Sequence, residues 1–190
     1  MRNTYCIGDS NTWGYDSRSY LGSRYPREVR WTGILEASGI PVINLGQNGA
    51  CIRDFGSFEQ SSPLFQNSSG EDIAVILLGS NDLLSGRSAE NAAWELDQLI
   101  SSFLPHFAHT VLCSPVPLQE GEWVTSASMI QESELLPAFC SAIAERYHIL
   151  CADSDHWGID LLYDGVHFSE KGHRIFAEHM KQLLLPFHSV

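Results

Sequence analysis

The chain has 190 residues and a formal net charge of -12 at neutral pH, with 23 acidic and 11 basic side chains. This length predicts one domain, residues 1–190, that buries a sizeable core. The acidic charge argues against a nucleic-acid or anionic-membrane partner, because phosphate groups would be repelled.

The beginning of the chain and its cysteines predict the cellular compartment. Met1-Arg2-Asn3 leads directly into an apolar run, and no stretch of about 18 apolar residues could span a bilayer. The five cysteines cannot all pair, form no Cys-x-x-Cys spacing and mostly lie in apolar runs. We therefore expect a cytoplasmic protein without a membrane partner, whose cysteines are reduced core residues.

Short apolar runs alternate along the chain with longer amphipathic ones, which is typical of a parallel sheet with helices on both faces. The apolar runs do not alternate with polar residues, as expected for strands covered on both sides. In chain order, strands are predicted at 4–7, 42–45, 73–78, 110–113 and 149–151.

Helices are predicted between these strands and after the last one. Ser169 is a plausible N-cap of the last helix, Pro186 is expected just beyond its end, and Pro137 lies near the start of the helix before it. The polar stretches 16–27 and 61–72 are predicted to be surface loops. The predicted helices are 28–38, about 53–65, 88–107, 135–147 and 169–185.

Five strands and five helices predict an α/β fold, a three-layer α/β/α sandwich with a five-stranded parallel sheet. In the flavodoxin-like strand order 2-1-3-4-5, the functional crevice lies at the carboxyl ends of strands one and three. Those strands end in Gly8-Asp9-Ser10 and Gly79-Ser80-Asn81-Asp82. Two polar turns that begin with glycine are therefore expected to face the same crevice.

Four short polar blocks follow one another along the chain. They are Gly8-Asp9-Ser10, Asn44-Leu45-Gly46-Gln47-Asn48-Gly49, Gly79-Ser80-Asn81-Asp82 and Asp164-Gly165-Val166-His167-Phe168. With these blocks in this order, the chain resembles the SGNH hydrolases of the GDSL esterase superfamily, nearest their arylesterase and acyltransferase branch. The residue after Ser10 is Asn11 where the family name has leucine, and we expect this departure to lie on the loop surface.

The resemblance implies roles that acyl transfer requires. Ser10 would be the nucleophile, His167 its general base and Asp164 the carboxylate that orients the imidazole. The oxyanion would be held by the backbone N–H groups of Ser10 and Gly46 and by the side-chain amide of Asn81. Asp9 and Asp82 are interpreted as acceptors of backbone N–H groups that order their loops.

A second Asp-x-x-His pair, Asp153 and His156, competes with Asp164 and His167 for the role of base. Spacing alone does not choose between them. The later pair is favoured because it directly precedes the predicted N-cap Ser169 and because its neighbours match the family block.

Several aromatic and apolar residues are predicted to line the substrate pocket, and the alternative for each is a place in the core. No metal is expected, because His106 and His109 alone are too few for a zinc site. The predicted substrate-binding residues are Trp13, Tyr15, Pro115 and Val166.

These observations predict a serine esterase that cleaves small acyl esters, acetyl or short-chain, through an acyl-enzyme. No cofactor is expected, the partner is a small-molecule ester, and a homo-oligomer stays open. Two alternatives belong to other classes: a flavodoxin-like protein that binds phosphate or a nucleotide, and a non-catalytic carbohydrate-binding module.

Overall fold

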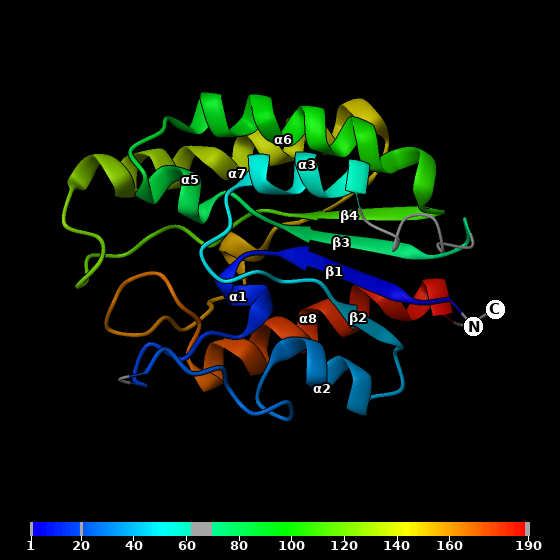
Figure 1. Cartoon of the computed structure of the whole chain (residues 1–190), viewed down its shortest axis with the longest axis horizontal. Coiled ribbons are helices and arrows are strands. Elements are labelled where there is room, and N and C mark those ends of the chain that lie inside the picture. Colours follow the sequence, from blue (N-terminus) through cyan, green and yellow to red (C-terminus); the bar gives the residue numbers. More distant parts are fainter. Residues whose placement is uncertain (1, 20, 62–69, 189–190) are drawn as a thin grey trace.

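The computed structural model describes residues 2–19, 21–61 and 70–188. A five-stranded sheet with the order β2-β1-β3-β4-β5 runs through its middle, and all neighbouring strands are parallel (Figure 1). The predicted α/β fold and strand order are confirmed, with strand ends that differ by one residue or less from the expected ones. The strands are β1 Thr4–Gly8, β2 Val42–Asn44, β3 Ile73–Leu77, β4 His109–Cys113 and β5 Leu150–Ala152.

The central strand β3 shows why an apolar run without alternation forms this sheet. All five of its residues are buried, because helices cover both faces. Ala74 and Ile76 belong to the core under α3 (Ile52–Ser61), α6 (Ala89–Phe103) and α7 (Ala127–Tyr147). Ile73, Val75 and Leu77 belong to the core under α2 (Trp31–Ala37) and α8 (Glu170–His188). Successive side chains of a strand point to opposite faces, so one apolar run supplies both cores.

Helices form the two outer layers (Figure 1). The helices α3, α5, α6 and α7 lie on one face of the sheet, and α2 and α8 lie on the other. Helices α2 and α6 are shorter than the predicted helices 28–38 and 88–107, because turns rather than further helix flank them. The helices are α2 Trp31–Ala37, α3 Ile52–Ser61, α5 Ser80–Leu84, α6 Ala89–Phe103 with a 3-10 turn at Leu104–His106, α7 Ala127–Tyr147 and α8 Glu170–His188.

Two helix boundaries were wrong in the sequence prediction, and each of the two helices contains a proline. Helix α7 begins at Ala127 rather than at residue 135, because Ser126 caps it and Pro137 is accommodated inside it. Helix α8 continues through Pro186 to His188, because Phe187 packs on the core and stacks on the His109 ring. The predicted end of the 53–65 helix and most of the 61–72 loop lie outside the described residues.

Two one-turn helices follow β1 and β3 where the sequence suggested only turns. Helix α1, Ser10–Trp13, and helix α5 begin directly after the strands, at the carboxyl edge of the sheet. A single turn is too short to show a helical period. Both polar turns therefore present their side chains from helix N-termini.

The remaining predictions concern membranes and cysteines. None of the described helices is long and apolar enough to cross a membrane. All five cysteines are free; Cys6, Cys113 and Cys140 are buried, whereas Cys51 and Cys151 are partly exposed. The expected core position is thus confirmed for three of the five.

Candidate active site

Ser10 is the first residue of α1, directly after the carboxyl end of β1. Its side chain is only 3% exposed. Asp9 is the N-cap of this helix, and its Oδ1 accepts a hydrogen bond of 2.9 Å from the Asn11 backbone N–H. The loop-ordering interpretation of Asp9 is confirmed, and the short helix holds the Ser10 hydroxyl at a fixed place on the sheet edge.

His167 and Asp164 come from the loop between β5 and α8. The His167 Nε2 lies 3.0 Å from the Ser10 Oγ, and its Nδ1 lies 2.8 Å from the Asp164 Oδ2. The other Asp164 oxygen accepts bonds of 2.9 Å from the backbone N–H groups of Val166 and His167. The three side chains thus form one continuous hydrogen-bonded chain, and all are buried.

The surroundings of Asp164 favour its ionised form. Burial by itself would raise the pKa of this carboxyl, but hydrogen bonds from the His167 ring and from backbone N–H groups lower the pKa to about 2. A carboxylate that stays charged holds the imidazole with its proton on Nδ1, which leaves Nε2 free to accept the Ser10 proton.

The loop closes tightly at Gly165. This residue has a φ of 79°, in the left-handed region that favours glycine. A Cβ added there would lie 2.0 Å from the Gln119 carbonyl oxygen. Gly165 therefore provides both the backbone conformation that places Asp164 against His167 and the room for the neighbouring chain.

Asn81 is the second residue of α5. Helices α5 and α1 follow the neighbouring strands β3 and β1. Its Nδ2 donates one hydrogen bond of 2.9 Å to the Ala50 carbonyl oxygen, which orients the amide. The neighbouring Asp82 accepts a bond of 3.1 Å from the Ile52 backbone N–H, as its loop-ordering interpretation requires. An amide nitrogen carries two hydrogens, so one remains for a substrate oxygen.

Gly46 is a glycine for packing reasons. A Cβ there would lie 2.2 Å from the Trp13 backbone nitrogen, so only glycine lets the loop after β2 approach α1. The Gly46 N–H donates to the Asn44 Oδ1 at 2.9 Å, and this donor is therefore already used. Gly49, in the same loop, is exposed and has a φ of 77°. Among the described hydrogen bonds, none involves its N–H group.

The competing pair at 153–156 is arranged differently. The His156 side chain is 82% exposed, and its Nε2 lies 3.4 Å from the carboxylate of the adjacent Asp155. Asp155 in turn accepts a bond of 2.7 Å from the buried Ser114. His156 thus faces solvent and its own neighbour, while the structure places His167 beside Ser10.

Asn11 is not on the loop surface, and this expectation was wrong. The residue is only 5% exposed, and its side chain turns inward between α1 and the His167 loop. Its Nδ2 donates to the Val166 carbonyl oxygen at 3.2 Å, and its Oδ1 accepts from the Phe168 N–H at 2.9 Å. A polar residue is needed at this position because it pairs buried backbone groups.

Aromatic rings surround the His167 imidazole. The Tyr15 ring centroid lies 4.6 Å from that of His167, and the Trp123 ring stands edge-on to it at 4.8 Å. Trp13 packs beside Tyr15 and under the Arg24 guanidinium. Trp123 is 45% exposed and lies in the loop after β4, where a large aromatic residue at the carboxyl edge of the sheet is its sequence signal.

The other two predicted substrate-binding residues are buried. Val166 is 4% exposed and packs in the core under α6 and α7. Pro115 is also buried, next to Gly79 at the end of β3. The structure thus brings Tyr15 and Trp13 to the surroundings of His167, whereas Val166 and Pro115 are buried in the interior.

Within the described ranges, no group of three or more His, Cys, Asp or Glu side chains could hold a metal ion. His173 is a buried histidine close to the site, packed on the Tyr25 and Phe168 rings. Burial lowers its pKa to about 3, so it stays neutral in this apolar environment.

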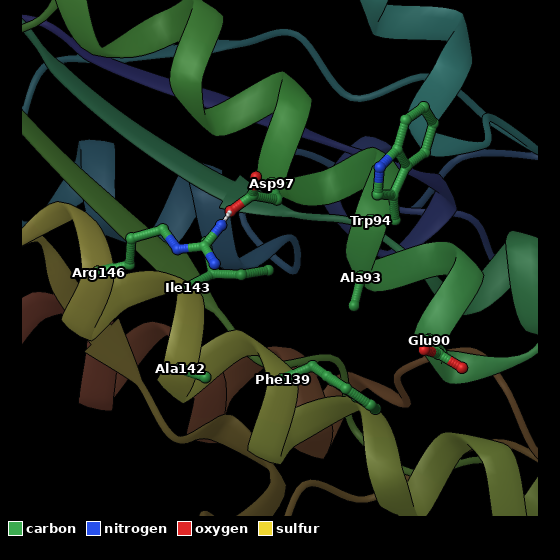
Figure 2. A pocket seen from close by; sticks show the side chains of 8 residues that line it. All are labelled: Glu90, Ala93, Trp94, Asp97, Phe139, Ala142, Ile143 and Arg146. Atoms are coloured by element: carbon green, nitrogen blue, oxygen red, sulfur yellow. Dashed lines mark hydrogen bonds and ion pairs between the residues drawn. The ribbon is translucent and has the colours of Figure 1, made fainter.

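A hollow of about 250 Å³ lies away from these residues, between α6 and α7 (Figure 2). Figure 2 shows Arg146 of α7 paired with Asp97 of α6, and Trp94 with its ring turned away from α7. The lining contains no serine or histidine, so the chemistry described above has no counterpart there. Its lining residues are Glu90, Ala93, Trp94, Asp97, Phe139, Ala142, Ile143 and Arg146.

Comparisons with known structures show the same fold. A carbohydrate acetylesterase from Sinorhizobium meliloti is 23% identical, with 98% of this chain and 99% of that chain covered and a TM-score of 0.84. An aryl esterase from M. smegmatis is 22% identical, with 98% and 100% covered and a TM-score of 0.85. A GDSL-family lipolytic protein from Veillonella parvula is 19% identical, with 97% and 99% covered and a TM-score of 0.82.

A comparison with curated protein sequences finds no match. The model of the GDSL-like lipase/acylhydrolase family matches residues 6–175, a range that contains all four blocks. The chain therefore belongs to the GDSL-like lipase/acylhydrolase family and is a carboxylic ester hydrolase.

Proposed function

We propose that this enzyme hydrolyses small acyl esters through an acyl-enzyme on Ser10. The observation that carries the proposal is the hydrogen-bonded chain from the Ser10 Oγ through His167 to Asp164, with links of 3.0 and 2.8 Å. His167 takes the serine proton as Ser10 attacks the ester carbonyl, and it passes that proton to the leaving alcohol oxygen. His167 then activates the water that releases the acid, and Asp164 holds the imidazole in the required tautomer.

The negative charge on the tetrahedral intermediate needs donors preorganised near Ser10. The Ser10 N–H and the second hydrogen of the Asn81 amide are the proposed donors. Gly46 supplies a third donor if its bond to Asn44 is exchanged for one to the substrate. The Gly49 N–H belongs to the same loop, and it is the alternative third donor because no hydrogen bond joins it to residues 2–19, 21–61 or 70–188.

The ester's leaving group is proposed to lie against Tyr15 and Trp123. His167 protonates the leaving oxygen, so the alcohol part must sit beside the imidazole, where these two rings stand. Flat rings favour an alcohol part with an apolar face. Acetyl esters of carbohydrates and aryl esters both meet this requirement, and the names of two structural neighbours point the same way.

The test is the hydrolysis of short-chain p-nitrophenyl esters by the wild type and by variants of the hydrogen-bonded chain. We expect Ser10→Ala and His167→Ala each to lower kcat by at least about 10³-fold, and Asp164→Asn to lower it by about 10²-fold or more. His156→Ala is the matched control and should retain full activity. Full activity of Ser10→Ala, or loss of activity in His156→Ala alone, would contradict the proposed mechanism.

The same assay, run with phenyl acetate and ethyl acetate, tests the leaving-group position. Trp123→Ala should raise KM for phenyl acetate about 3- to 10-fold, because the variant loses one aromatic contact with the phenyl ring. The KM for ethyl acetate, which has no ring, should change less. Trp94→Ala, an exposed tryptophan on α6, is the control. Equal effects of Trp123→Ala on both esters would argue against this placement of the alcohol.

A further inference from the structure

The loop that carries Asp164 and His167 is held from one side by Asn11. The Asn11 amide donates to the carbonyl oxygen of Val166 and accepts from the N–H of Phe168, the two residues that flank His167. Asn11 directly follows Ser10 in α1, and the Trp31 indole donates to its carbonyl oxygen at 3.1 Å. One buried side chain therefore sets the separation between the nucleophile's helix and the residues on both sides of the base.

The same loop is held from the other side by the turn 119–124. Three main-chain hydrogen bonds join the two segments: Gln119 N–H to the Gly165 carbonyl at 2.9 Å, and Glu122 and Trp123 N–H groups to the Tyr163 and Asp164 carbonyls at 3.2 Å each. Most of this turn is exposed, and Val124 anchors its end in the core. The turn thus uses its backbone to hold the Asp164 loop.

Gly121 is the residue that permits this close approach. A Cβ at Gly121 would lie 2.4 Å from the Asp164 carbonyl carbon, 2.5 Å from the Gly165 nitrogen and 2.6 Å from the Asp164 oxygen. All three are backbone atoms, which cannot swing aside as the end of a side chain can. An alanine at this position must therefore displace the backbone that carries Asp164.

We propose that Asn11 and Gly121 are positioning residues for the reaction, which hold His167 at hydrogen-bonding distance from Ser10. The inference rests on the proposed function of Ser10, His167 and Asp164. Neither residue has to touch the substrate; each acts through the loop that carries the base. Proton transfer requires a distance near 3 Å, and a displacement of 1 Å in such a site typically costs about 10²-fold in rate.

Two variants test the two sides separately. Asn11→Leu keeps the branched shape of the side chain but loses both hydrogen bonds, and Gly121→Ala adds one methyl group against the Asp164 backbone. The controls make the same substitutions elsewhere: Asn91→Leu at an exposed position of α6, and Gly56→Ala, where a Cβ would meet nothing within 4 Å. Thermal unfolding measures the folded fraction of each variant, so that kcat is expressed per folded molecule.

We expect Asn11→Leu and Gly121→Ala to lower kcat for p-nitrophenyl acetate about 10- to 100-fold with KM changed less than 3-fold. The proton NMR signal of the His167 Nδ1–H, far downfield when bonded to Asp164, should shift or broaden in both variants. A merely structural role would lower the unfolding temperature and leave this signal unchanged in the folded molecules. The controls should match the wild type in kcat, KM and the Nδ1 signal, and Gly56→Ala should unfold at the same or a slightly higher temperature because alanine favours the helix.

Folded variants with wild-type kcat and an unchanged Nδ1 signal would overturn the inference. If Asn11→Leu does not fold, Asn11→Asp replaces it: the acceptor for Phe168 is kept, the donor to Val166 is lost, and unchanged kcat again overturns the role of Asn11. Ser10→Ala, assayed in parallel, distinguishes a failure of the positioning roles from a failure of the proposed function. An active Ser10→Ala refutes the mechanism itself, whereas an inactive Ser10→Ala beside fully active Asn11 and Gly121 variants refutes only the positioning roles.

Discussion

Two buried aspartates near Ser10 differ in pKa because their surroundings differ. Asp164 receives hydrogen bonds on both oxygens, and these outweigh burial and lower its pKa to about 2. Asp9 is 1% exposed, and burial raises its pKa to about 6 although the Asn11 N–H donates to it. Only Asp164 is thus held firmly as the charged partner of His167.

The raised pKa of Asp9 predicts a gain in stability for Asp9→Asn that depends on pH. Above pH 6 the folded state carries an ionised Asp9 that it disfavours, and below about pH 3 the group is protonated in both the folded and the unfolded state. The amide keeps an oxygen for the Asn11 N–H and carries no charge. The variant should therefore be more stable than the wild type at pH 8 by up to ~3 kcal/mol, and this difference should fall below ~1 kcal/mol at pH 4.

Urea unfolding at pH 8, 6 and 4 measures this difference. Asp153→Asn is the matched control, because Asp153 is exposed, and it should leave the free energy of unfolding unchanged at all three pH values. A wild type more stable than Asp9→Asn at pH 8 would show that the charge of Asp9 is compensated in the folded protein.

At the scale of elements, α6 shows how far a local pattern determines a helix. Its apolar residues recur at helical spacing, and Ser88 caps its N-terminus, the Ser88 Oγ accepting a bond of 3.2 Å from the Asn91 N–H. The short helices α1 and α5 have no such period. They form because β1 and β3 deliver their first residues to the sheet edge, which no local window of sequence reveals.

Removal of the α6 cap should weaken this helix by a known amount. Ser88→Ala leaves the Asn91 N–H without its side-chain acceptor, and the free energy of unfolding should fall by about 1 kcal/mol. Ser101→Ala, at an exposed position inside α6, should change stability by less than about 0.5 kcal/mol. Chemical denaturation of both variants measures the difference, and equal effects would mean that the cap contributes nothing specific.

At the scale of the whole molecule, the core under α2 and α8 supports the loop that carries Asp164 and His167. The Phe176 ring of α8 packs on Trp31 at 4.9 Å and on Phe168 at 5.4 Å, measured between ring centroids. Phe168 directly follows His167, and its N–H is the group that Asn11 binds. Contacts therefore run from α8 to Phe168 and Asn11, the residues next to His167 and Ser10 in the chain.

Phe176→Ala should accordingly be severely destabilising. Phe176 is fully buried, and the cavity left by its ring should cost about 3–5 kcal/mol of the free energy of unfolding. The matched control is Phe139→Ala, because Phe139 is a partly exposed phenylalanine on α7. This variant should lower the free energy of unfolding by less than Phe176→Ala does. A loss below about 1 kcal/mol for Phe176→Ala would mean that the helices collapse around the cavity.

The sequence by itself determined the strands and the four blocks, because apolar runs and turn residues act over a few positions and leave a local signal. The sheet order was expected from the flavodoxin-like fold class that the alternating strands and helices indicate, not from any local signal. Only the tertiary structure decided which Asp-x-x-His pair lies beside Ser10, that Asn11 is buried, and that Trp123 and Gly121 contact the Asp164 and His167 loop. These contacts join residues from 40 to more than 150 positions apart. Their geometry depends on how the sheet brings its loops together, and no local pattern records that.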